Sequence, residues 1–176
     1  MLEIDVTIDE DYDEETNQFS VAQSFKVRLE HSLVSVSKWE SVWEEAFLSD
    51  KDKTSEQTIS YVQMMLLDEN VPPEILQKLI EQHLRKIQEY IVARMTATKI
   101  ADDPTAPKTR DVKTAELIYY LMIELNIPME CQHWHLNRLL TLIRVVNQKN
   151  TPKQKMSLKD RRDLNRARRQ QFGTRG

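Results

Sequence analysis

Glycine is almost missing from this 176-residue chain, which contains only Gly173 and Gly176, both within the last four positions. Phosphate-binding loops such as GxxxxGK(S/T) and GxGxxG need glycine where their backbone takes positive φ angles or approaches the phosphate closely. The commonest nucleotide-binding architectures are therefore excluded. A helical fold, which needs few left-handed turns, is favoured over a multistranded sheet.

Cysteine and long apolar runs are also scarce. The single cysteine, Cys131, cannot form an internal disulfide and is typical of a reducing compartment. The mean hydropathy of −0.59, with no long uncharged apolar run, excludes a transmembrane helix. The N-terminus lacks the basic flank and apolar stretch of a secretory signal. We therefore expect a cytosolic protein without membrane contact.

Charge is unevenly distributed, although the formal net charge is only −3. Residues 1–30 contain nine acidic and two basic side chains, whereas residues 147–176 contain ten basic and two acidic ones. Ends of opposite sign can attract each other across protomers, which suggests a homo-oligomer, or they can bind different partners. Two solvated tails would show the same pattern.

Hydrophobic periodicity predicts a mainly α protein. Apolar residues alternate from Leu2 to Ile8 and again from Phe19 to Leu29, which predicts a β-hairpin. The three- and four-residue spacing further on predicts a compact domain of about five helices, followed by a basic tail that is either a short helix or disordered. The predicted parts are the hairpin arm at 1–31, the helical domain at 32–148 with a flexible linker near 99–112, and the tail at 149–176.

Capping signals predict where the helices begin. Serine or threonine before an apolar run can accept hydrogen bonds from exposed backbone N–H groups, and proline suits a first helical position. The predicted starts are at Ser37, at Thr54 or Ser55, at Pro73, at Thr114 and at Pro128. Asn126 suits a helix end, and the helix from Pro128 should continue through Val146.

The only cluster of metal-type ligands is Cys131, His133 and His135. On a helix, Cys131 and His135 share a face and His133 points away, whereas structural zinc needs four ligands and catalytic zinc usually three. We therefore predict no metal, no other cofactor and no enzymatic activity, although a Cys131–His135 nucleophile pair is formally possible. His135 is predicted to be a hydrogen-bonded core or interface histidine, and Cys131 a small buried apolar group.

The basic tail is the best candidate for nucleic-acid binding, because clustered cations give salt-dependent affinity for phosphate. Its only aromatic residue is Phe172, so a stacking platform is not evident. A solubilising tail, a tail that docks on the acidic N-terminus and a segment that folds on an acidic partner together outweigh nucleic acid. The tail cations are Lys153, Lys155, Lys159, Arg161, Arg162, Arg166, Arg168 and Arg169.

Six segments carry a likeness to a known family: Leu33–Ser41, Thr114–Tyr120, Leu125–Pro128, His133–Val145, Lys155–Ser157 and Leu164–Gly176. They resemble small proteins encoded among the tail-morphogenesis genes of tailed bacteriophages, commonly called tail assembly chaperones. The resemblance covers roughly residues 30–176 and is much weaker over the hairpin. The resemblance depends on the order of residues in these segments and includes no catalytic signature.

The resemblance implies a non-enzymatic protein of the host cytoplasm that coats the apolar, helical tape-measure protein until tail-tube subunits polymerise around it. Such a partner would dock by placing an amphipathic helix in an apolar groove. From apolar spacing, we predict that Trp39, Trp43, Trp134, Leu139 and Ile143 line this groove or its supporting core. The alternatives are a structural virion connector or adaptor, and a small nucleic-acid-associated protein that acts through the basic tail.

Overall fold

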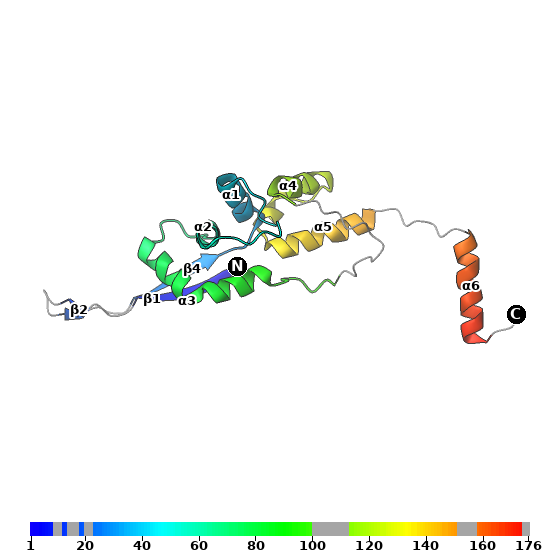
Figure 1. Ribbon diagram of the computed structural model, residues 1–176, viewed down its shortest axis with the longest axis horizontal. Helices are drawn as coiled ribbons and strands as arrows, with labels where there is room; N and C mark the ends of the chain where they lie inside the picture. Colours follow the sequence, from blue (N-terminus) through cyan, green and yellow to red (C-terminus); the bar gives the residue numbers. More distant parts are fainter. Residues whose placement is uncertain (9–11, 14–17, 20–22, 100–112, 151–157, 174–176) are drawn as a thin grey trace. The chain divides into compact units, whose positions relative to one another are not determined.

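Figure 1 shows the computed structural model, whose elements are mainly helices with an N-terminal β-hairpin. The predicted fold class is confirmed. The chain forms two compact units, Met1–Val146 and Asn147–Gly176. The structure describes residues 1–8, 12–13, 18–19, 23–99, 113–150 and 158–173.

The hairpin pairs β1 (Leu2–Ile8) with β4 (Gln23–Leu29) in antiparallel register, with Ile4 opposite Val27 and Val6 opposite Phe25. Ile4, Val6 and Val27 are buried, as the alternation predicts, because one face of the hairpin packs against α3. In chain order the strands are β1 (Leu2–Ile8), β2 (Tyr12–Asp13), β3 (Gln18–Phe19) and β4 (Gln23–Leu29).

Helices occupy most of the remaining described chain. In Figure 1, α3 runs beside the hairpin, and α1 lies beside α4. The helices are α1 (Leu33–Trp43), α2 (Ser55–Met64), α3 (Pro73–Val92), α4 (Ala115–Glu124), the 3-10 helix η1 (Met129–His133), α5 (Leu136–Asn150) and α6 (Leu158–Phe172). No helix in this part of the chain is long and apolar enough to cross a membrane.

Three predicted helix starts are confirmed. The Thr54 hydroxyl accepts a hydrogen bond from the Gln57 N–H at 3.2 Å, and Pro73 is the first residue of α3. Thr114 caps α4 by accepting from the Leu117 N–H at 3.4 Å. Asn126, after α4, has a φ of 52°, the left-handed conformation expected near a helix end. The linker predicted near 99–112 falls almost wholly outside the described residues.

The predicted start of the first helix at Ser37 is wrong. Helix α1 begins at Leu33, and its N-cap is Ser32. Ser32 and Ser35 form a reciprocal capping box, in which each side-chain oxygen accepts the other residue's backbone N–H, at 3.2 Å and 3.0 Å. Ser37 and Glu40 have the spacing of a capping box, but Glu40 bonds instead to distant backbone N–H groups.

The continuous helix predicted from Pro128 to Val146 is also wrong. The chain forms the short η1, becomes extended at Trp134, and starts α5 at Leu136. The interruption has a tertiary cause, because Ser32 and His135 form an antiparallel bridge and the Leu136 N–H donates to the His31 carbonyl at 2.7 Å. Cys131 and His135 therefore do not lie on one helical face.

Candidate functional site

Three of the five residues predicted to line a groove or support it lie in the hydrophobic core. Trp39 is 1% exposed, and Leu139 and Ile143 are likewise buried. The Trp39 indole N–H donates to the Gln57 carbonyl at 3.0 Å, and Phe47 packs edge-on against its ring at 5.2 Å between centroids. These side chains can support a binding surface, but no partner reaches them without local unfolding.

The other two tryptophans are half-buried. Trp43 stacks on Trp39 with 6.2 Å between ring centroids, and its indole N–H donates to the Ser60 hydroxyl at 3.1 Å. The Arg138 guanidinium lies 4.0 Å from the centre of the Trp134 ring, a cation–π contact. Each ring is therefore contacted by a neighbouring side chain while part of it remains accessible.

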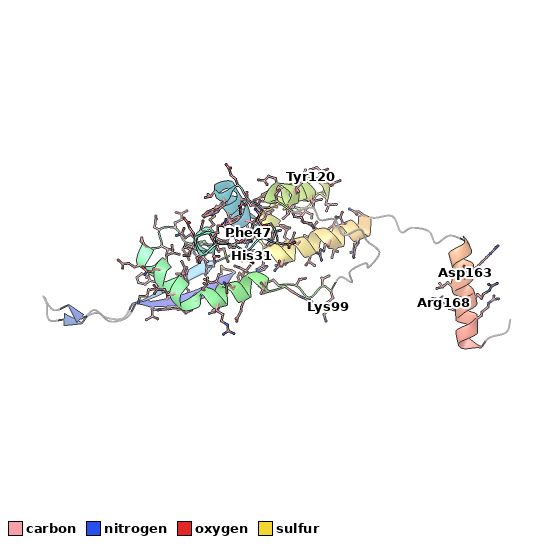
Figure 2. The ribbon with its side chains drawn as sticks, in the orientation of Figure 1. His31, Phe47, Lys99, Tyr120, Asp163 and Arg168 are labelled. Carbon is pink, nitrogen blue, oxygen red and sulfur yellow. The ribbon has the colours of Figure 1, made fainter. Side chains whose placement is uncertain are left out.

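The exposed apolar residues gather most clearly on α4. Leu117, Tyr120 and Ile123 are 46%, 59% and 67% exposed, and we call these three the α4 face. They are separated by three positions each, so they follow one side of the helix. Ile118 and Met122 are buried on the opposite side. Figure 2 shows Tyr120 at the outer edge, whereas His31 and Phe47 lie in the interior.

Sequence reasoning did not single out Tyr120 or Ile123. The missed signal is the composition of AELIYYLMIE, in which Glu116 and Glu124 are the only charged residues. A helix that is apolar on nearly every side is either buried completely or has an apolar surface left for a partner. Only the fold distinguishes these cases.

Acidic groups border the α4 face. Glu116 and Glu124 are both exposed, one near each end of the helix. On the side nearer the core, the Tyr119 hydroxyl donates to the Gln132 side-chain oxygen at 3.1 Å, which links α4 to η1. The α4 face thus has an apolar centre and negatively charged ends. This arrangement complements an apolar helix face that carries basic flanks.

The buried carboxylate of Glu40 holds α4 in place. One oxygen accepts from the Phe47 N–H at 2.8 Å, and the other accepts from the Ala115 N–H at 2.7 Å. Ala115 is the first residue of α4, so a negative charge lies at the positive end of the helix dipole. Glu40 therefore connects α1, the chain that follows it and α4, and fixes where the α4 face points.

A second buried polar cluster surrounds His135. Its Nδ1 accepts from the Asn137 N–H at 3.3 Å, so its Nε2 carries the hydrogen that it donates to the Tyr90 carbonyl at 3.0 Å. The ring is thus neutral, and burial lowers its pKa. The prediction of a hydrogen-bonded core or interface histidine is confirmed, and Cys131 is buried as expected.

His31 packs beside His135, with 5.0 Å between the ring centroids. Its Nδ1 lies 2.5 Å from the Tyr61 hydroxyl oxygen, and burial together with the neighbouring His135 lowers its pKa to about 3. The Tyr90 hydroxyl donates to buried Glu30 at 2.6 Å. These groups satisfy one another inside the core, which is the arrangement of a structural network.

Within the described ranges, no three His, Cys, Asp or Glu side chains are placed to hold a metal ion. Cys131 and His135 belong to separate elements, η1 and the residues before α5. The two residues therefore do not share the helical face on which a Cys131–His135 nucleophile pair would depend.

The basic tail is described in part, as α6. Arg162, Arg166, Arg168 and Arg169 are exposed, and the first, second and fourth of them share one face through their spacing of four and three. Lys159 and Arg161 belong to α6, but their side chains are not described. Lys153 and Lys155 lie outside the described residues.

No protein-family model matches this chain, and neither a curated protein nor a solved structure matches it.

Proposed function

We propose that this chain is a non-enzymatic tail assembly chaperone, which binds and shields helical segments of a phage tape-measure protein through the α4 face. The observation that carries the proposal is the outward exposure of Leu117, Tyr120 and Ile123 on a helix whose opposite side is packed into the core. The identity of the partner comes from the resemblance of the sequence to this family. The host cytoplasm is the proposed place of action.

Physical considerations favour a helix as the bound element. A second amphipathic helix can cover a straight row of apolar side chains by helix-in-groove docking. Burying apolar surface contributes roughly 25 cal/mol per Å², so a short row gives modest affinity for each site. Several copies along one long partner would then coat it reversibly, as assembly requires before tail-tube subunits replace them.

The flanking charges suggest which helices bind. Glu116 and Glu124 favour segments with lysine or arginine beside the apolar stripe, and they disfavour acidic ones. Half-buried Trp43 lies on α1, which packs against α4, and could extend the contact. The buried Trp39, Leu139 and Ile143 would support the surface from within.

Co-expression with the tape-measure protein tests the proposal. The native chain should raise the soluble fraction of that protein, and the double variant Tyr120→Ser/Ile123→Ser should lose most of the effect. Leu67→Ser is a matched control, because it removes an exposed apolar side chain outside α4. No gain in solubility with the native chain, or an equal gain with all three proteins, would contradict the proposal.

Two further measurements separate the alternatives. A virion connector or adaptor would be present stoichiometrically in purified particles, whereas a chaperone would be absent or substoichiometric there. A nucleic-acid-associated protein would lose salt-sensitive retention on DNA when Arg162, Arg166 and Arg169 are changed to glutamine, and its α4 variants would behave like the native chain.

A further inference from the structure

A cavity of about 440 Å³ lies between the C-terminal end of α3, the residues that follow it and α5. Its lining includes three cationic side chains, Arg94, Lys99 and Arg144, and we call this cavity the basic pocket. Among the described residues that line it, none is acidic. The pocket shares no residue with the α4 face, so a ligand there would be additional to the proposed docking partner.

The walls of the pocket are held by specific hydrogen bonds. Asn137, in the first turn of α5, donates its amide hydrogens to the carbonyls of Ile91 at 3.0 Å and Ala93 at 2.9 Å. These bonds fix the end of α3 against α5 and occupy carbonyls that would otherwise repel an anion. The chain that carries Arg94 therefore leaves α3 in a defined direction.

Besides the three cations, the lining offers an anion the hydroxyl group of Thr96. The hydroxyl oxygen of Thr96 accepts from the Thr98 N–H at 3.2 Å, which leaves the Thr96 hydroxyl hydrogen free to donate to a ligand. Arg94, Lys99 and Arg144 form no ion pair with any residue that the structure describes. Three like charges around one cavity repel one another, and an anion between them removes that repulsion.

We propose that the basic pocket binds a phosphate ester of small-molecule size. Three cations match a phosphate group, which carries a charge of about −1.5 to −2 and three strong acceptor oxygens at neutral pH, better than a single carboxylate. Guanidinium groups can bind phosphate through two parallel hydrogen bonds.

The volume and the lining residues of the pocket further restrict the class of ligand. The cavity of about 440 Å³ falls in the range of small-molecule pockets, roughly 300–1,000 Å³. Pockets in this range enclose whole organic molecules, so the phosphate can carry an organic group. No aromatic side chain lines the pocket among the described residues, whereas Val92 and Leu140 supply aliphatic surface. Recognition of a stacked nucleobase is therefore not part of the proposal.

Titration of the full chain with inorganic pyrophosphate, followed by calorimetry and by amide NMR shifts at constant ionic strength, tests the proposal. Saturable binding is expected, with shifts at Thr96, Thr98 and around Thr141. Arg94→Gln and Arg144→Gln should each weaken binding by about tenfold or more, since hydrogen bonds to charged groups contribute that much. Lys86→Gln is the matched control, because Lys86 is an exposed cation of α3 outside the pocket.

Four outcomes overturn the proposal. They are absence of saturable binding, equal affinity in the native chain and both arginine variants, shifts confined to α6, and succinate binding as tightly as pyrophosphate. The last result would assign the pocket to carboxylates. If pyrophosphate shows no saturable binding but a single-stranded DNA oligonucleotide does, and both arginine variants weaken it, the pocket would be assigned to nucleic acid. Each variant changes an exposed side chain, and its thermal melt should match that of Lys86→Gln.

Discussion

The Glu40 carboxylate accepts a hydrogen bond from the Ala115 N–H at 2.7 Å, across 75 positions of sequence. This bond joins α1 to the first turn of α4, while the other carboxylate oxygen holds the Phe47 N–H. A single buried side chain thus determines how the helix that bears the exposed apolar face is seated.

Replacing Glu40 should destabilise the fold. Glu40→Gln places an NH₂ group against one of two backbone donors, so one hydrogen bond is lost, and we expect about 1–3 kcal/mol less unfolding free energy. Glu40→Ala should cost more, because both N–H groups lose their partner. Urea unfolding measures the loss, with Glu44→Gln as the exposed control. Equal unfolding midpoints for Glu40→Gln and the control would mean that the two Glu40 hydrogen bonds do not stabilise the fold.

Two isoleucines on α4 should respond in opposite ways. Ile118 is fully buried and Ile123 is 67% exposed, so Ile118→Ser should cost roughly 3–5 kcal/mol and Ile123→Ser no more than about 0.5 kcal/mol. Thermal melts of the two variants make the comparison on one helix with the same substitution. A large loss for Ile123→Ser would mean that this side of α4 is covered.

Substitutions of Trp39 and Trp134 should lower the unfolding free energy by different amounts, because one ring lies in the core and the other is partly exposed. Trp39→Ala removes a fully buried ring and its hydrogen bond to Gln57, with an expected loss of about 3–5 kcal/mol. Trp134→Ala should cost less than about 2 kcal/mol, because its ring is only half-buried and its main polar contact is with Arg138. Denaturant unfolding, monitored by far-ultraviolet circular dichroism, measures both losses. A larger loss for Trp134→Ala than for Trp39→Ala would contradict the prediction.

Stability should fall in mild acid because of His31. Its pKa is about 3 in the folded protein and near 6.5 when unfolded, so between these values the unfolded chain binds the extra proton. The contribution of neutral His31 is complete above about pH 6.5 and decreases as pH falls towards 3, at no more than about 1.4 kcal/mol per pH unit. His135, whose pKa is also lowered, adds to the loss in the same direction.

Unfolding free energies between pH 7 and pH 4.5 check this dependence. Tyr61, His135 and Glu30 surround the site. The variant His31→Gln isolates the histidine contribution, because it removes the titrating group and keeps a polar side chain near Tyr61. We expect a flatter profile for His31→Gln, and an unchanged slope would show that other groups carry the acid sensitivity.

Local sequence was sufficient for several elements. Thr54, Pro73 and Thr114 mark helix starts because a cap depends on hydrogen bonds within three residues or on the φ angle of one residue. The alternation from Leu2 to Ile8 indicates a strand for the same reason, since neighbouring side chains point to opposite faces. His135 was predicted to be a hydrogen-bonded core or interface histidine and Cys131 a small buried apolar group, because the cluster has too few ligands on one helical face for a metal.

Long-range contacts produced the features that sequence reasoning missed. Ser32, not Ser37, caps α1, and the Glu40 carboxylate that a cap at Ser37 would have used bonds instead to Ala115 far along the chain. The break at Trp134 follows from the pairing of Ser32 with His135, which no local propensity encodes.

The periodicity of the chain specifies that this protein is helical and which residues are apolar enough to pack, and local capping signals specify where three of the helices begin. Which side of α4 faces outward, and which cations surround the cavity beside α5, depend on how those helices come together. Apolar and charged residues have the same local signature whether they meet a neighbouring element or solvent, so only packing separates a core from a surface that awaits a partner.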